Sequence, residues 1–177
     1  MNSLTIVLLV CIVVAVTTIG GLAAYSASLR NVIRQAQRQE EQRQAIERSK
    51  ITLPIRLQAY ERLALLLERI SPESLLLRVD SQGADAKAYE ALLLETIRTE
   101  WSHNLSQQIY VSREVWTLVK SARGQVSKLI TLSGEKMHPD SPASELSRTL
   151  LSALLEMETH PTALALQGLR DEAQQLF

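Results

Sequence analysis

The sequence lacks a surplus of charge of either sign. Its 177 residues include 19 Lys and Arg and 19 Asp and Glu, so the formal net charge is zero. A domain that binds nucleic acid usually carries a basic excess to neutralise phosphates, and this chain carries none. The composition therefore argues against nucleic acid as a partner.

Aromatic residues, glycine, proline and cysteine are also scarce. Aromatic residues make up 4% of the chain, with six Gly and five Pro, too few for a disordered or fibrous protein. No stretch alternates β-branched and polar residues, so we predict an all-α protein. The single cysteine, Cys11, excludes an intramolecular disulfide and is compatible with a reducing compartment.

Charged residues are absent from the first 29 positions. Residues 4–25, LTIVLLVCIVVAVTTIGGLAAY, match the about 20 apolar residues that a helix needs to cross a bilayer. We therefore predict a transmembrane helix over residues 1–29. A cleaved signal peptide finds support in the small residues of AAYSAS, but the start MNS lacks a basic n-region. A lipidated Cys11 is disfavoured because Val10 stands where a small residue is expected.

Basic residues follow this segment directly. They are Arg30, Arg34, Arg38, Arg43, Arg48 and Lys50, whereas the N-terminal flank has no Lys or Arg. Because the basic flank of a span stays in the cytoplasm, we predict the N-terminus outside and the C-terminal domain in the cytoplasm. Contact of these side chains with anionic lipid head groups is an alternative that stays open.

Small residues recur four apart within the expected span. The pairs are Thr17 with Gly21, Gly20 with Ala24, and Ala23 with Ala27. Such faces let two helices approach closely, which makes a homodimer through the span one expectation. Small residues also occur in spans that do not dimerise.

Residues 30–50 have the composition of a polar helical stalk. The stretch QAQRQEEQRQ, residues 35–44, is rich in helix formers but contains no large apolar residue. A coiled coil requires apolar positions sustained over several heptads, and Val32 and Ile33 begin a seam that does not continue. We predict a solvated helix continuous with the span, ending before Pro54 begins a new helix.

Residues 51–177 are predicted to form a helical bundle of about four to five helices. Apolar residues recur every three or four positions in about 55–70, 86–110, 113–132, 144–158 and from Pro161 to the end. Ser71, Asp85 and Ser112 are predicted N-caps. The domain is long enough to bury one core.

Two polar anomalies interrupt this apolar pattern. Arg56 falls on the apolar face near Tyr60, and the last two turns of the 86–110 helix are polar. The candidate site residues are Arg56, Tyr60, Glu61, Arg62, Glu100, His103, Asn104, Gln107 and Gln108. A buried hydrogen-bond network in which Glu100 neutralises Arg56 is one interpretation, and a partner-docking surface or a catalytic pocket are the others.

No catalytic, metal or cofactor motif is recognisable. His160 follows Glu156 by one helical turn, but this pair lacks the further ligand that a zinc site needs. A Gly-rich phosphate loop, a Ser-His-Asp pattern and an HExxH motif are not found. We therefore expect no cofactor, no metal and no catalytic residue.

Two stretches, LPIRLQAYERLALLLERISPESLLLRV (53–79) and EWSHNLSQQIYVSREVWTLVKSA (100–122), carry a resemblance. With their motifs RLQAYERL and HNLSQQIY, they resemble an uncharacterised family of small single-span membrane proteins from Bacteroidetes-type bacteria. The resemblance covers most of the chain from about residue 50 to its end. It implies a domain of unknown function with an N-terminal span and a helical remainder.

These expectations combine into one functional hypothesis. The chain is expected to be a membrane-anchored, non-enzymatic adaptor, scaffold or accessory subunit that recruits a protein partner at the inner membrane. The alternative is a small enzyme or ligand sensor with a polar site around Arg56, Glu100 and His103.

Overall fold

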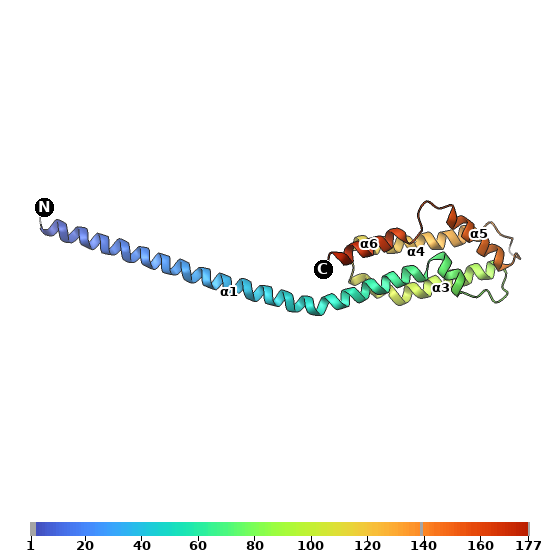
Figure 1. The fold of residues 1–177 in the computed structure, drawn as a ribbon, viewed down its shortest axis with the longest axis horizontal. Coiled ribbons are helices and arrows are strands. Elements are labelled where there is room, and N and C mark those ends of the chain that lie inside the picture. Colours follow the sequence, from blue (N-terminus) through green and yellow to red (C-terminus); the bar gives the residue numbers. More distant parts are fainter. Residues whose placement is uncertain (1–2, 139, 177) are drawn as a thin grey trace. The chain divides into compact units, whose positions relative to one another are not determined.

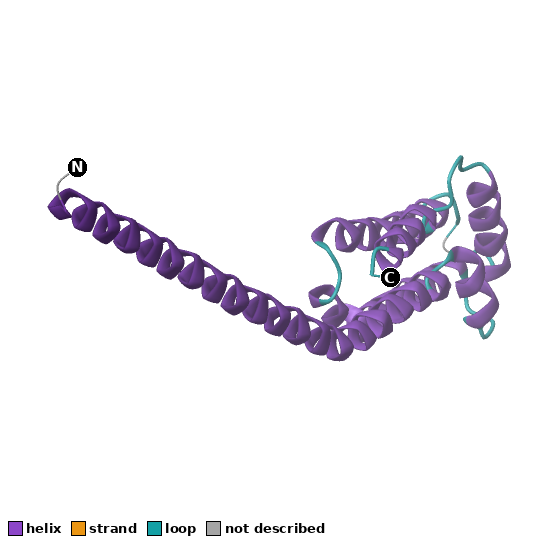
Figure 2. Cartoon of the chain, turned by 60° about the vertical axis from the view of Figure 1, so that its left-hand side comes forward, coloured by secondary structure: helices purple, strands orange, loops and turns teal. Residues whose placement is uncertain are grey.

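The computed structural model describes residues 3–138 and 140–176, without the side chains of part of residues 3–48, and every regular element in them is helical (Figures 1 and 2). The elements are α1 (Ser3–Arg69), α2 (Pro72–Arg78), α3 (Ala86–Asn104), the 3-10 helix η1 (Leu105–Ile109), α4 (Arg113–Gly134), α5 (Ala143–Leu155) and α6 (Ala163–Gln174). The predicted all-α class is confirmed.

The contacts divide the chain into two compact units, Met1–Ile51 and Thr52–Phe177. In the first unit, α1 is the regular element, and the side chains of residues 34–44 are exposed. Exposure agrees with a composition that offers no apolar face to bury. The QAQRQEEQRQ stretch is thus a helix that lies in solvent within its own unit.

Among the described residues, no helix is both apolar enough and long enough to cross a membrane. The predicted transmembrane helix over residues 1–29 is therefore not supported by the described part of the structure. Many of the side chains on which that prediction depends lie outside the description.

The predicted helix boundary at Pro54 is wrong, because α1 runs without interruption from Ser3 to Arg69. An interior proline removes the backbone hydrogen bond to the carbonyl of residue i−4, here Lys50, and its ring crowds that carbonyl. Both Lys50 and Pro54 are exposed, so water can solvate that carbonyl. The buried apolar face of α1 begins about one turn after Pro54, and its packing in the core keeps that part of the chain helical.

The core of the second unit is built from the apolar faces that the sequence indicates. α4 lies centrally and packs against α3, α5 and α6. The largest fully buried side chains are Leu63, Leu66, Leu67, Ile70, Leu75, Leu93, Ile97, Val119, Val126, Ile130, Leu146 and Leu150. Each fully buried Leu or Ile stabilises the fold by about 1.5–3 kcal/mol relative to an exposed one.

Three predicted N-caps position the helices. The side chains of Ser71, Asp85 and Ser112 accept hydrogen bonds from the backbone N–H groups of Ser74, Ala88 and Val115. The 86–110 helix ends earlier than predicted, at Asn104, and η1 takes over. The polar side chains in its last turns weaken the burial that would hold a longer helix.

Candidate functional site

The structure distributes the nine predicted site residues over different surroundings. Arg56 and Tyr60 belong to one polar cluster and Glu100 and Asn104 to another. The side chains of Glu61, Arg62, His103 and Gln108 are exposed, while Gln107 is buried and donates to Ser106. The interpretation in which Glu100 neutralises Arg56 is wrong, because Arg56 bonds to Glu172 and Glu100 bonds to two other arginines.

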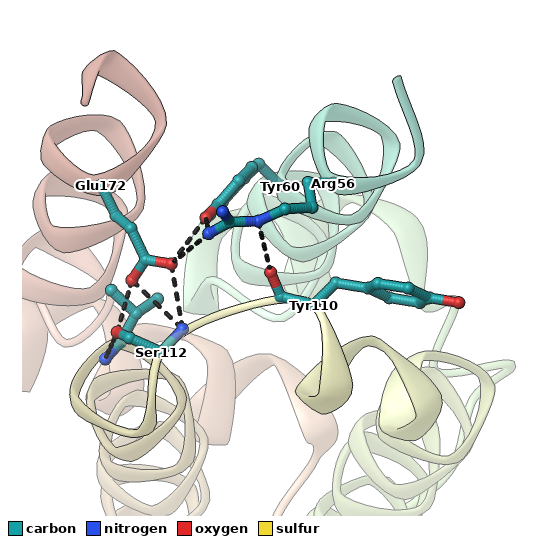
Figure 3. Close-up of polar contacts among 6 residues, drawn as sticks. Arg56, Tyr60, Tyr110, Ser112 and Glu172 are labelled. Carbon is teal, nitrogen blue, oxygen red and sulfur yellow. Dashed lines mark hydrogen bonds and ion pairs between the residues drawn. The ribbon is translucent and has the colours of Figure 1, made fainter. Parts of the chain in front are cut away.

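The first cluster, here called the Glu172 cluster, joins α1, α4 and α6 through Arg56, Tyr60, Ser112 and Glu172 (Figure 3). The Tyr60 hydroxyl donates to Glu172 Oε1 at 2.6 Å, and Arg56 Nη2 lies 3.4 Å from the same oxygen. The backbone N–H of Ser112 donates to Oε1 at 2.9 Å, and its hydroxyl donates to Oε2. One carboxylate therefore binds segments from both ends of the domain sequence.

Arg56 also fixes the chain that enters α4. Its Nη2 donates to the Tyr60 hydroxyl at 2.8 Å, one turn along α1, and its Nε donates to the carbonyl of Tyr110 at 3.2 Å. Figure 3 shows the Tyr110 ring directed away from the cluster, so only its backbone takes part. The charge on the apolar face of α1 thus has partners, as a half-buried charge requires.

The electrostatics of the Glu172 cluster keep the carboxyl ionised. Burial alone raises the pKa of Glu172, but hydrogen bonds from Ser112 and Tyr60 and the charge of Arg56 outweigh it and hold the pKa below its usual range. Burial and the bond to the Glu172 carboxylate raise the pKa of Tyr60 to about 12. Because Ser112 is the N-cap of α4, the positive end of that helix dipole also favours the anion.

A cavity of about 380 Å³ adjoins this cluster. Its lining is Thr52, Ile55, Arg56, Ile109, Tyr110, Val111, Ser112 and Glu172. A concave site of this size that is mostly apolar and holds a few convergent polar groups has the character of a ligand-binding site. Among the predicted residues, only Arg56 lines it.

The second cluster, here called the Glu100 cluster, joins α3 to the α1–α2 region. Arg69 Nε donates to Glu100 Oε1 at 2.9 Å, and Arg78 Nη1 lies 3.2 Å from that oxygen. Asn104 donates to the backbone carbonyl of Glu100 at 2.9 Å. The hydrogen bond from Arg69 and the nearby positive charges lower the pKa of Glu100 despite its burial.

His160 lies in the connection between α5 and α6, because α5 ends at Leu155 and does not carry it. Its Nε2 is 3.1 Å from Glu73 Oε2, and its Nδ1 is 3.0 Å from the Thr162 hydroxyl. The backbone N–H of Thr162 donates to the same Nδ1 at 3.3 Å. The contact with Glu73 ties this connection to α2. Thr162, which holds the other side of the ring, is buried.

Sequence reasoning missed Glu172, the residue that organises the first cluster. A signal for it exists, since Glu172 continues the apolar stripe of α6 that includes Ala165 and Leu169. A carboxylate on one buried stripe and an arginine on another can neutralise each other's charge. The pair can be predicted only if Glu172 and Arg56 are both recognised as charges on apolar faces.

The fold and these clusters define a protein whose described elements are all helical and whose bundle is fastened by half-buried carboxylates. The chain belongs to a family described as a family of unknown function (DUF7935), whose model matches residues 4–176. Membership in such a family agrees with the resemblance noted in the sequence, while bacterial origin and membrane character stay predictions. No curated protein and no solved structure matches the chain.

Proposed function

We propose that the protein is a non-enzymatic adaptor that holds a protein partner at a membrane. The observation behind this proposal is that two half-buried carboxylates of the bundle, Glu172 and Glu100, hold helices together. Glu172 and Glu100 each accept several bonds, and every described buried side-chain polar atom has a partner. A catalytic acid, base or nucleophile must instead be positioned to react with a substrate.

The membrane part of the proposal rests on the sequence. Residues 4–25 contain no charged side chain, and six basic residues follow between Arg30 and Lys50. A stretch of that length partitions into hydrocarbon, and the basic flank sets its direction. We place the N-terminus outside and the bundle in the cytoplasm of a bacterium, with the inner membrane as the anchor.

Alkaline extraction of cell membranes tests the anchor. We expect the full chain to stay in the pellet and a chain lacking residues 1–29 to be released. Val13→Lys places a charge in the middle of the apolar stretch and should reduce retention, whereas Leu29→Lys at its edge should not. Release of the full chain by alkali contradicts the anchor.

Recruitment is tested separately by crosslinking in intact cells and purification from membranes. We expect one defined protein to be recovered with the full chain and lost with a control chain that ends at residue 51. Equal recovery with both chains would assign the interaction to the span and stalk. Recovery of the full chain alone, or only as its own dimer, contradicts the adaptor function.

The alternative, an enzyme or sensor at Arg56, Glu100 and His103, requires the three to share one site. Arg56 bonds to Glu172, whereas Glu100 bonds to Arg69 and Arg78. Of the three, only Arg56 lines the cavity beside the Glu172 cluster. The geometry therefore favours the adaptor over a site built from that set.

A further inference from the structure

The cavity beside the Glu172 cluster combines apolar walls with two charged side chains that are not equally available to a ligand. Its walls are mainly apolar, with Ile55, Ile109 and Val111 among the lining residues, and its polar side includes Arg56 and Glu172. The hydrogen-bonding state of those polar groups decides what chemistry a ligand must bring. Each donor and acceptor can be followed in Figure 3.

The Glu172 carboxylate has little accepting capacity left. Oε1 accepts from the Tyr60 hydroxyl, from Arg56 Nη2 and from the Ser112 backbone N–H. Oε2 accepts from the Ser112 hydroxyl, which in turn accepts from the N–H of Val115. A cationic or donor ligand would have to displace bonds that already exist.

Arg56 is different, because part of its guanidinium remains available. Nε and Nη2 are bonded to Tyr110, Tyr60 and Glu172, whereas Nη1 has no partner among the described residues. The side chain is 37% exposed, so an incoming group can reach it. A guanidinium offers only donors, and a carboxylate is among its strong acceptors.

We propose that this cavity binds a carboxylate attached to a short aliphatic body. The carboxylate bonds to Arg56 Nη1, and the aliphatic part covers the apolar walls. Ile109 is 72% exposed and Ile55 42% exposed, so apolar surface is left for such a body to bury. Removing this apolar surface from water favours binding.

This site does not depend on membrane attachment or on recruitment, so its test is independent of theirs. The probes are 4-methylpentanoate and its uncharged analogue 4-methylpentanamide, added to the purified full chain with ¹³C-labelled isoleucine methyl groups. We expect the acid to shift the Ile55 and Ile109 methyl signals saturably. The amide should bind at least tenfold more weakly, because it cannot form the charged bond.

Two arginines on the same helix provide the matched variants. Arg56→Gln should abolish the preference for the acid, and Arg62→Gln, which alters an exposed residue outside the cavity, should leave it unchanged. The methyl signals of the buried Ile97 and Ile130 report whether each variant is folded. If Arg56→Gln proves unfolded, Arg56→Lys, which keeps the charge, should retain a preference for the acid over the amide.

Three outcomes overturn the proposal: equal binding of acid and amide, an unchanged preference in folded Arg56→Gln, or shifts that do not saturate. Binding of N-acetyl-leucine then distinguishes two sources of the ligand carboxylate, a peptide carboxyl end and a free aliphatic acid. Tighter binding than 4-methylpentanoate assigns the site to a peptide carboxyl end. Weaker binding assigns it to a free aliphatic acid.

Discussion

The two carboxylates that fasten the bundle are exposed to solvent to nearly the same degree, but they accept hydrogen bonds from different kinds of donor. The side chain of Glu172 is 14% exposed and that of Glu100 is 13% exposed. Glu172 takes most of its bonds from neutral donors, the Tyr60 hydroxyl and the Ser112 N–H and hydroxyl. Glu100 takes its side-chain bonds from two arginines.

The two clusters differ in how well water can solvate the donor groups that remain after the carboxylate is removed. Arg69 and Arg78 have side chains 42% and 34% exposed, so water can solvate both guanidinium groups. Tyr60 is buried, and its hydroxyl would lose the acceptor of its proton. A cluster of neutral donors should therefore be more sensitive to loss of its anion than a cluster of exposed cations.

The largest effect is expected from Glu172→Ala. It should lower the free energy of unfolding by about 2–4 kcal/mol, because hydrogen bonds to a charged group contribute roughly 1.5–3 kcal/mol each and do not add fully. Glu100→Ala, the matched control, should cost about 1 kcal/mol. Urea unfolding of the full chain measures both. An equal or larger loss with Glu100→Ala would reverse the comparison.

Alkaline pH should separate the clusters next, because only the Glu172 cluster contains a tyrosine. The pKa of Tyr60 is raised to about 12 in the folded protein, against about 10 for an unperturbed tyrosine. The folded state therefore holds this proton more tightly, so the contribution is complete below pH 10 and declines as pH rises to 12. The loss reaches about 2–3 kcal/mol.

Unfolding curves measured across that interval test the assignment. Tyr60→Phe should remove most of the slope of stability against pH. The raised pKa of Tyr89 leaves a remainder in the same direction, and Tyr89→Phe should remove that part. An unchanged slope in Tyr60→Phe would contradict the role of the Glu172 cluster.

At neutral pH the same two tyrosines give a smaller contrast. The Tyr60 hydroxyl donates to a carboxylate at 2.6 Å, and that of Tyr89 donates to the carbonyl of Val79 at 2.9 Å. Tyr60→Phe should cost about 1.5 kcal/mol and Tyr89→Phe about 1 kcal/mol, because a charged acceptor makes the stronger bond. Thermal unfolding of the two variants under one condition checks the order, which fails if Tyr89→Phe costs more.

Sequence reasoning recovers the parts of this molecule that depend on local patterns. Apolar spacing locates the helices of the bundle, and side-chain chemistry locates the caps Ser71, Asp85 and Ser112. It also finds Arg56, because a charge on an apolar face is visible in one helix alone. Local rules fail at Pro54, where tertiary packing downstream holds α1 together.

Partner choice is the part that the sequence does not determine. Glu100 and Arg56 were natural partners by charge, yet Arg56 reaches a residue 116 positions away in α6. The side chain of Arg69 is 42% exposed, and its length still lets it reach Glu100. Such pairings follow from how the helices pack, which only the three-dimensional arrangement reveals.

Salt should produce the smallest difference between the clusters. Raising the ionic strength from about 0.1 M to about 1 M shortens the Debye length from about 10 Å to about 3 Å, which weakens exposed charge pairs. A double-mutant cycle for Arg69 and Glu100 should lose a few tenths of a kcal/mol of coupling. The cycle for Tyr60 and Glu172 is the control and should change less, because the tyrosine is neutral and buried. A larger salt effect on the tyrosine pair would show that the charge of Arg56, not the neutral donors, dominates the Glu172 cluster.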